Sequence, residues 1–183
     1  MVSIEGRSRI EKMFADKREE LKRFPGGKPL EQRRRDWEAE ARLDVLPKGS
    51  RFSPVDAAGI KSEWMEMPLV NKGRAFLLLH GGGYNAGSPR THRRMAANLA
   101  RAAHMPVLTP DYRLAPEHVF PAAVKDALKA YGFLLDQGLG EDNIIVGGDS
   151  AGGGLALSML LALREAGAKM PRAAVLMSPW TDL

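Results

Sequence analysis

The sequence predicts an α/β domain, in which a mainly parallel sheet is covered by helices on both faces. Short apolar runs of strand length alternate with longer helical segments from Arg51 onward. Strands buried on both faces are typically continuous apolar runs, and parallel strands need crossover connections that are usually helical. Two of the runs end in glycine-rich turns, 80–83 and 148–152, where functional groups would gather at one edge of the sheet.

The length and composition are those of one ordinary globular domain. The chain has 183 residues, a net charge of +5 and no cysteine. The absence of cysteine excludes disulfides and thiolate nucleophiles, and it fits the cytoplasmic location that we expect. No apolar run is long enough for a signal peptide or a membrane span, so we expect neither secretion nor membrane insertion.

The basic charge does not predict a nucleic-acid partner. The sharpest basic cluster is 33–35, but acidic residues follow it at Asp36, Glu38 and Glu40. Mixed signs are typical of a solvated helix face. Because no nucleic-acid recognition motif accompanies the charge, we expect no nucleic-acid binding.

Residues 1–48 are predicted to form a helical cap segment that is separate from the α/β part at 49–183. One amphipathic helix covers 4–24 and ends at the breaker Pro25-Gly26-Gly27, and a second covers 30–46. Both helices are rich in charge and poor in apolar residues, so we expect them to lie over the site as a cap. The alternative is a solvated extension with no role in the site.

The remaining elements alternate along the chain. The first strand has the apolar and polar alternation of a half-buried strand, and the later ones are continuous apolar runs. The predicted strands are 60–68, 74–80, 105–110, 143–147 and 173–178, and the predicted helices are 89–103, 121–137 and 151–166.

The segment Gly148-Asp-Ser-Ala-Gly152 fits the G-x-S-x-G pattern of a serine nucleophile. It lies between an apolar strand and an apolar helix, which is the context that the pattern requires. Small flanking residues let the serine project from a sharp turn, and the helix amino terminus favours negative charge there. Ser150 is therefore the candidate nucleophile, and the Ala151 amide is a candidate oxyanion donor. The alternative is a glycine-rich turn with an incidental serine.

The segment His80-Gly81-Gly82-Gly83 follows an earlier apolar strand. Residues without a Cβ let backbone N–H groups approach a substrate oxygen closely. Gly82 and Gly83 are therefore the candidate donors of an oxyanion hole. We expect His80 and Gly81 to support this loop, with the His80 ring orienting the loop by hydrogen bonding and not acting as a base.

A dinucleotide site of the Rossmann type is a competing hypothesis. Gly81-x-Gly83-x-x-Ala86 matches the looser form of that fingerprint, and Asp111 follows the next strand. However, Asp111 comes about 30 residues later where about 20 is expected, and the serine motif would remain unexplained. No Gly-Lys-Ser/Thr sequence of a phosphate-binding loop is present. A serine hydrolase explains both glycine motifs.

Together with neighbouring blocks, these motifs resemble those of the hormone-sensitive-lipase-like (GDXG) lipolytic esterases of the α/β-hydrolase fold. The resemblance runs from Phe76 to the last residue, with a small departure at Gly147, where the family more often has serine or alanine. The similar blocks are FLLLHGGGY, SPRTH at 88–92, DYRLAPE at 111–117, FPAA at 120–123, GGDSAGGG and SPWTD at 178–182.

The resemblance implies a carboxylic ester hydrolase acting on a small-molecule ester or lactone. It implies Ser150 as nucleophile, with Gly82, Gly83 and Ala151 as oxyanion donors, and it implies no cofactor and no metal. The N-terminal helices would help to cap the acyl pocket. The charged residues of the DYRLAPE block would hold their loop under the site; they are Asp111, Arg113 and Glu117.

The usual acid and base of such a site are missing from these residues. Family order places an Asp and then a His after the serine. All the histidines precede Ser150, and Asp182, the only carboxylate after Glu165, belongs to the SPWTD block; the histidines are His80, His92, His104 and His118. We therefore expect a C-terminally truncated member in which 49–183 is a partial domain without the last strands and helices.

The missing acid and base have three possible explanations, of which truncation is the one we expect. We expect it to be inactive alone and either to self-associate or to be complemented by a C-terminal segment, because the strand at 173–178 would lie at a sheet edge with unpaired backbone groups. One alternative is that His92 or His118 is recruited as the base. The other is a non-catalytic α/β module that binds esters or a partner.

Overall fold

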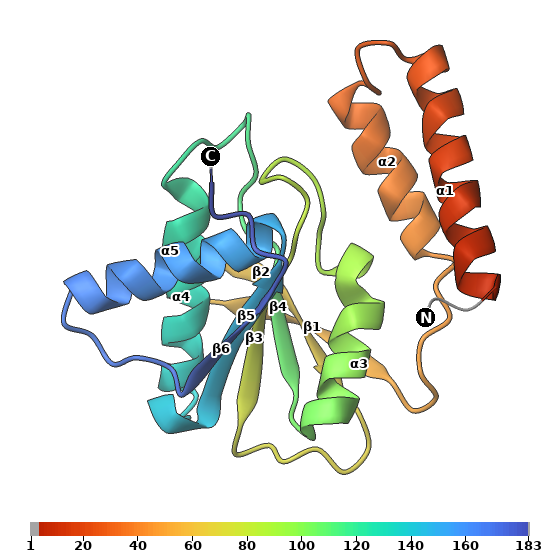
Figure 1. Ribbon diagram of the computed structural model, residues 1–183. Coiled ribbons are helices and arrows are strands. Elements are labelled where there is room, and N and C mark those ends of the chain that lie inside the picture. Colours follow the sequence, from red (N-terminus) through yellow and green to blue (C-terminus); the bar gives the residue numbers. More distant parts are fainter. Residues whose placement is uncertain (1–3, 183) are drawn as a thin grey trace.

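Six strands form one sheet in the order β1-β2-β4-β3-β5-β6 in the computed structural model, which describes residues 4–182 (Figure 1). The first two strands form an antiparallel hairpin, β2 runs antiparallel to β4, and β4, β3, β5 and β6 run parallel. The predicted mainly parallel sheet is therefore confirmed. The strands are β1 (Arg51–Ala57), β2 (Ile60–Glu66), β3 (Ala75–Leu79), β4 (Val107–Pro110), β5 (Ile144–Asp149) and β6 (Ala173–Met177).

Helices cover both faces of this sheet. Helix α3 (Arg93–Ala103) lies on one face, and α4 (Ala122–Asp136) and α5 (Ala151–Glu165) lie on the other (Figure 1). Successive side chains of β3 point to opposite faces of the sheet. Leu77 and Leu79 pack with α4 and α5, whereas Phe76 and Leu78 pack with α3. This double burial explains why β3 is apolar at every position.

The sequence prediction missed β1. Most of its side chains are exposed, and Pro54 lies within it, so it has neither the apolar run nor the alternation of a buried strand. The strand exists because it pairs with β2 along its whole length. A two-residue turn joins the two strands, with positive φ at Ala58 and Gly59, which is the turn geometry that antiparallel hairpins favour.

Two of the predicted helices differ from the observed ones by more than one residue at an end. The segment 89–103 is a short 3-10 turn, η1 (Arg90–His92), followed by α3. The helix predicted at 30–46 is wrong at its end, because α2 (Leu30–Ala41) stops five residues earlier than that. Leu43 and Val45 are more than four-fifths exposed, so no burial of their side chains would stabilise an extension of the helix.

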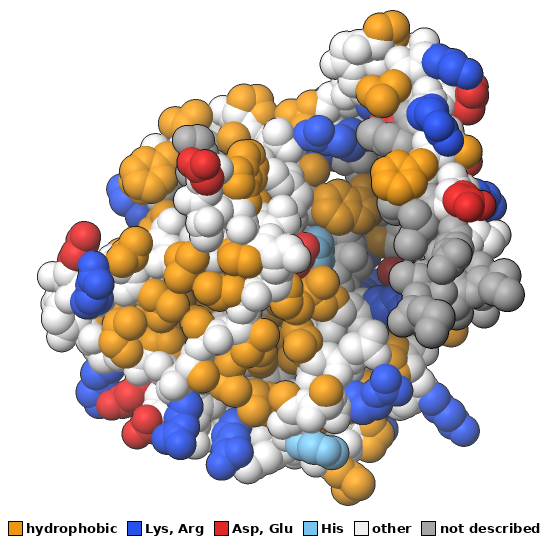
Figure 2. Space-filling view, viewed as in Figure 1, with side chains coloured by type: hydrophobic (Ala, Val, Ile, Leu, Met, Phe, Trp, Pro, Cys, Tyr) orange, Lys and Arg blue, Asp and Glu red, His pale blue; other side chains and the backbone are white. Residues whose placement is uncertain are grey.

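The N-terminal helices α1 (Ile4–Arg23) and α2 stand beside the sheet on the side of α3 (Figure 1). No residue of α2 is buried, yet the helix contacts the η1 turn. Figure 2 shows a hollow between these helices and the body of the molecule. The boundary between a cap segment at 1–48 and an α/β part at 49–183 stays a prediction.

Strand β6 is an edge strand, as the sequence led us to expect. Its first three residues are exposed, and so are Leu161 of α5 and Trp180 beyond β6. Figure 2 shows hydrophobic side chains gathered over α5 and β6. Within residues 4–182, no helix is both long enough and apolar enough to cross a membrane.

Candidate active site

Ser150, the candidate nucleophile, occupies the sharp turn between β5 and α5, which we call the nucleophile turn. Its φ of 50° and ψ of −119° lie outside the regions that a non-glycine residue ordinarily adopts, so the turn is strained. Two hydrogen bonds hold it: the Ser150 N–H donates to the Met177 carbonyl oxygen at 3.0 Å, and the Trp180 N–H donates to the Ser150 carbonyl oxygen at 2.8 Å. The Ser150 side chain is exposed at the carboxyl edge of the sheet.

The glycines on either side of Ser150 are required by close packing. A Cβ on Gly148 would collide with the Leu79 carbonyl oxygen, and a Cβ on Gly152 would collide with the same oxygen and lie 2.6 Å from that of His80. The end of β3 therefore approaches the nucleophile turn as closely as two backbones can.

The glycine loop after β3 lies next to this turn because β3 pairs with β5, with Leu79 opposite Gly148. Gly82 and Gly83 have φ values of 123° and 62°, which favour glycine. The Gly82 carbonyl oxygen accepts hydrogen bonds from the N–H groups of Asn85 and Ala86, which turn the loop back. Across residues 4–182, the N–H groups of Gly82, Gly83 and Ala151 donate no hydrogen bond.

The His80 ring is fully buried beneath the loop. It stacks on Tyr112 with ring centroids 4.1 Å apart, and its Nδ1 donates to the Gly81 carbonyl oxygen at 2.9 Å. Burial lowers the pKa of His80 to about 3, so the ring is neutral near pH 7. The Tyr112 hydroxyl donates to the His80 carbonyl oxygen at 2.6 Å and fixes the same stretch of backbone.

Asp149 joins the nucleophile turn to the glycine loop. Its Oδ1 accepts the Gly81 N–H at 3.0 Å and lies 3.3 Å from His92 Nε2. Burial acts to raise the pKa of Asp149, but the hydrogen bonds from His92 and Gly81 outweigh burial and hold the pKa below its ordinary value. Asp149 is therefore a carboxylate at neutral pH. The motif contained this residue, but no role was predicted for it.

The two histidines considered as recruited bases lie elsewhere. His92 is buried, with Nε2 beside Asp149 and Nδ1 2.8 Å from Thr91 Oγ1. His118 is exposed and lines an apolar pocket of about 220 Å³ together with Tyr84 and Leu155. In the part of the chain that the structure describes, no histidine nitrogen is hydrogen-bonded to Ser150.

Arg34 of α2 corrects the interpretation of the basic cluster as a solvated face. Its guanidinium donates to the carbonyl oxygens of Asn85 at 2.6 Å and Ala115 at 2.9 Å, and to both oxygens of Glu117. The hydrogen bond from Arg34 lowers the pKa of Glu117 to about 2. One side chain thus connects α2 to the glycine loop and to the loop after β4.

Two charged side chains of the DYRLAPE block, those of Arg113 and Glu117, pair with residues outside the block, whereas Asp111 contributes its backbone N–H. Arg113 donates to both oxygens of Asp126 in α4, at 2.9 and 2.7 Å, and Glu117 pairs with Arg34. The Asp111 N–H donates to the Lys61 carbonyl oxygen. The block therefore attaches its loop to α2, β2 and α4.

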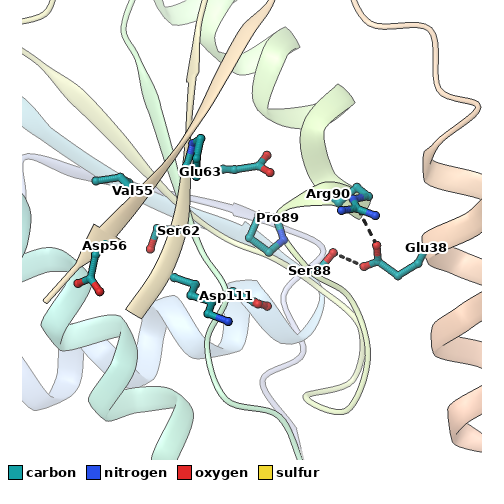
Figure 3. A pocket seen from close by; sticks show the side chains of 11 residues that line it. Glu38, Val55, Asp56, Ser62, Glu63, Ser88, Pro89, Arg90 and Asp111 are labelled. Carbon is teal, nitrogen blue, oxygen red and sulfur yellow. Dashed lines mark hydrogen bonds and ion pairs between the residues drawn. The ribbon is translucent and has the colours of Figure 1, made fainter. Parts of the chain in front are cut away.

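An open pocket of about 550 Å³ lies between α2 and the β1–β2 hairpin (Figure 3). Glu38 of α2 points across it, where it accepts a hydrogen bond from the Ser88 hydroxyl and lies 3.7 Å from the Arg90 guanidinium. Burial, together with the charges of Glu38 and Glu63, raises the pKa of Asp111 at the floor of this pocket. Ser150 does not line this pocket, so the pocket does not contain the candidate nucleophile.

Comparison with known proteins agrees with this geometry. A family model described as the alpha/beta hydrolase fold matches residues 76–183. An acetyl-hydrolase from Streptomyces hygroscopicus is 50% identical over 122 residues, which are 67% of this chain and 40% of that protein. An esterase from Acinetobacter venetianus is 38% identical over 133 residues, which are 73% of this chain and 44% of that protein.

Solved structures show the same likeness. An esterase of the bacterial hormone-sensitive lipase family has a TM-score of 0.81 at 44% identity, covering 85% of this chain and 52% of that one. An esterase/lipase from an uncultured bacterium has a TM-score of 0.82 at 45% identity, covering 86% of this chain and 54% of that one. The chain spans less than half the length of the two curated relatives and about half of each solved chain. The chain belongs to the hormone-sensitive-lipase-like esterase family of the α/β-hydrolase fold.

Proposed function

We propose that this chain carries the nucleophile and the oxyanion hole of a serine-dependent carboxylic ester hydrolase. The observation that carries the proposal is the contact between two motifs: Ser150 lies on a strained turn beside a loop in which the Gly82 and Gly83 amides have no internal acceptor. The Ala151 amide, at the amino end of α5, is the third donor. Free backbone donors next to a seryl oxygen are suited to a developing negative charge.

The chemistry is a two-step acyl transfer. Ser150 Oγ attacks the ester carbonyl carbon as a base removes its proton, and the carbonyl oxygen becomes an oxyanion that accepts N–H bonds from Gly82, Gly83 and Ala151. Collapse of this intermediate expels the alcohol, which takes the proton, and leaves an acyl group on Ser150. Water then attacks the acyl group, and the carboxylic acid and the free serine are released. No cofactor takes part in this sequence.

The base and its orienting acid are proposed to come from a segment outside these 183 residues. Three observations support this: the family order of Ser, Asp and His, the partial coverage of the relatives, and the absence of a histidine bonded to Ser150 in the described chain. The edge strand β6 and the apolar side chains around it would receive that segment. The same exposed edge would promote self-association when the segment is missing.

The substrate class is a small ester or lactone. The relatives are named acetyl-hydrolase, esterase and, in Pseudomonas putida, ethyl acetate hydrolase, and these names favour short acyl groups. The buried His80 is proposed to support the loop and not to exchange protons, because its pKa is far below neutrality and its Nδ1–H is committed to the Gly81 carbonyl.

The test is hydrolysis of p-nitrophenyl acetate by the chain alone and by the chain joined to the C-terminal segment of a family member. We expect negligible turnover alone and a gain of at least about 10³-fold in the joined protein, in line with the loss that follows removal of triad members. Ser150→Ala should abolish this gain. Ser158→Ala, on the same helix, should not, because the only hydrogen bond of the Ser158 hydroxyl within residues 4–182 goes to the Gly154 carbonyl oxygen.

Strong hydrolysis by the isolated chain that is lost in Ser150→Ala would contradict the need for an outside base and would support a recruited histidine. Hydrolysis that survives Ser150→Ala would overturn the proposed function itself. Binding of an ester analogue without turnover in the joined protein, together with failure of a fluorophosphonate to label Ser150, would favour a non-catalytic binding module.

A further inference from the structure

Three consecutive glycine amides belong to the loop beside the nucleophile turn, and the first of them is already bonded. The Gly81 N–H donates to Asp149 Oδ1 at 3.0 Å, whereas those of Gly82 and Gly83 donate to no group of the described chain. Asp149 is the residue immediately before Ser150. The bond from Gly81 therefore sets which amides of the loop remain for a ligand, and it ties their position to that of the nucleophile.

The packing around this bond leaves no room for the loop to slide. A Cβ on Gly81 would collide with Asp149 Oδ2 and would lie 2.9 Å from the Asp149 carbonyl oxygen. Beyond Gly81, the His80 ring lies against the backbone at Gly87, where a Cβ would be 2.8 Å from His80 Nδ1. A shift of the loop by one residue or by about 1 Å would break the Gly81 bond.

The His92 side chain contacts both partners of the hydrogen bond between Gly81 and Asp149. Its Nε2 is 3.3 Å from both Asp149 Oδ1 and Gly81 N, and its Nδ1 is 2.8 Å from Thr91 Oγ1. The imidazole therefore bridges the η1 turn, the nucleophile turn and the start of the glycine loop. It is buried, so solvent does not compete for these contacts.

The same ring contacts α2. Trp37 packs edge-on against His92 with ring centroids 5.6 Å apart, and its Cζ3 lies 3.1 Å from where a Cβ of Gly82 would be. The Ser88 hydroxyl, two residues before η1, donates to Glu38 of the same helix (Figure 3). The position of α2 is thereby connected to the loop through His92 and through Ser88.

We infer that Asp149 and His92 are positioning residues that hold the glycine loop in register with Ser150, and that His92 connects this register to α2 through Trp37. This inference rests on the proposed function. Neither side chain needs to touch the substrate. An oxyanion exists only after attack, so a misplaced loop weakens the transition state more than the bound ester. Loss of register should therefore lower kcat and leave KM nearly unchanged.

Electrostatics distinguishes this role from direct stabilisation of charge. A carboxylate next to the nucleophile repels an oxyanion, so Asp149 cannot assist the reaction through its own charge. The contacts with Gly81 and His92 offset the negative charge of Asp149, and through them Asp149 holds the glycine loop in place. Asp149→Asn keeps an oxygen acceptor for Gly81 and should retain most of the activity, whereas Asp149→Ala should not.

The experiment compares two variants of His92 by amide hydrogen exchange in the purified chain, which requires no catalytic activity. His92→Phe keeps the ring against Trp37 but removes both nitrogens, and His92→Gln returns a donor near the position of Nε2. We expect His92→Phe to speed exchange at Gly81 by about tenfold or more, with the amides of β3 unchanged, and His92→Gln to restore most of the protection. Thr91→Val, which removes the partner of Nδ1, serves as a second variant if His92→Phe does not fold.

The kinetic arm uses p-nitrophenyl acetate and the joined protein. His92→Phe should lower kcat by about 10 to 100-fold with KM within about twofold, since misplacement by 1 Å can have an effect of about 10²-fold. Unchanged Gly81 exchange in the folded variants, or equal acceleration throughout β3, would overturn the inference. Turnover that persists in Ser150→Ala would overturn the proposed function and leave the exchange result to decide the inference separately.

Discussion

The two sides of Ser150 differ in how completely this chain builds them. Toward β3, the nucleophile turn contacts a fully buried strand and a loop fixed by His80, Gly81 and Asp149. Toward β6, it contacts an edge strand whose first three residues are exposed. The contrast indicates that the geometry of the proposed nucleophile and of its proposed amide donors is specified within these residues, whereas the opposite wall of the site is not.

The largest expected effect is the loss of folding stability when a buried side chain of β3 is truncated. Leu77→Ala removes a fully buried side chain at the centre of the sheet and should lower the free energy of unfolding by about 2–5 kcal/mol. Val175→Ala, on the exposed side, should lower it by about 0.5 kcal/mol or less. Urea denaturation followed by circular dichroism measures both. Equal losses in the two variants would show that β6 is as well packed as β3.

A glycine substitution tests how closely β3 approaches the nucleophile turn. Gly152→Ala places a methyl group against the carbonyl oxygens of Leu79 and His80 and should be destabilising by about 1–3 kcal/mol. Gly132→Ala, in α4, has no atom within 4 Å of the new methyl group and should be stabilising by up to about 1 kcal/mol. The same urea measurement separates them, and a neutral Gly152→Ala would contradict the packing described.

The exposed side should also govern self-association. Val175→Lys puts a charge on the edge strand and should reduce the oligomers that sedimentation velocity detects, without loss of helix content. Leu43→Lys changes a residue that is 82% exposed between α2 and β1 and should leave association unchanged. If both variants associate like the parent chain, β6 is not the contact surface.

The smallest expected effect concerns the attachment of α2. The pKa of Glu117 is about 2 in the folded chain because Arg34 donates to it, whereas its ordinary value is 4.5. A carboxyl group with a lowered pKa stabilises the fold above the ordinary value, and this contribution is lost as the pH falls from about 4.5 toward 2. Exchange at the amides of α2 should therefore increase over that range.

Glu117→Gln should remove most of this pH dependence. Glu141→Gln, which breaks a surface pair with Lys169, should leave the exchange of α2 as it was. An α2 whose exchange does not respond to pH between 4.5 and 2 would show that Arg34 is held by the carbonyl oxygens of Asn85 and Ala115 alone.

The sequence predicted the parts of this molecule that depend on neighbours in the chain. Strands β3, β4 and β5 were recognisable because burial on both faces leaves continuous apolar runs, and Ser150 was recognisable because its turn needs small residues on both sides. Strand β1 was missed because pairing with β2, not burial, stabilises it.

The contacts that orient the site could not be predicted, because they join distant segments. His92 was considered as a base, yet its nitrogens face Asp149 and Thr91. Arg34 was read as part of a solvated face, yet it reaches two loops of the α/β part. Neither contact has a periodicity or a spacing that marks it in the sequence. A signal for His92 existed only in the SPRTH block of the family resemblance.

The most direct test of the proposed oxyanion hole is the NMR spectrum of the joined protein, which contains the proposed base, with a small boronic acid that forms a tetrahedral adduct with a nucleophilic serine. We expect the amide protons of Gly82 and Gly83 to shift downfield in the adduct, the amide proton of Gly81 to stay near its original position, and Ser150→Ala to abolish all of these changes. An adduct on Ser150 that leaves the amide protons of Gly82 and Gly83 unshifted would show that these amides are not the oxyanion donors.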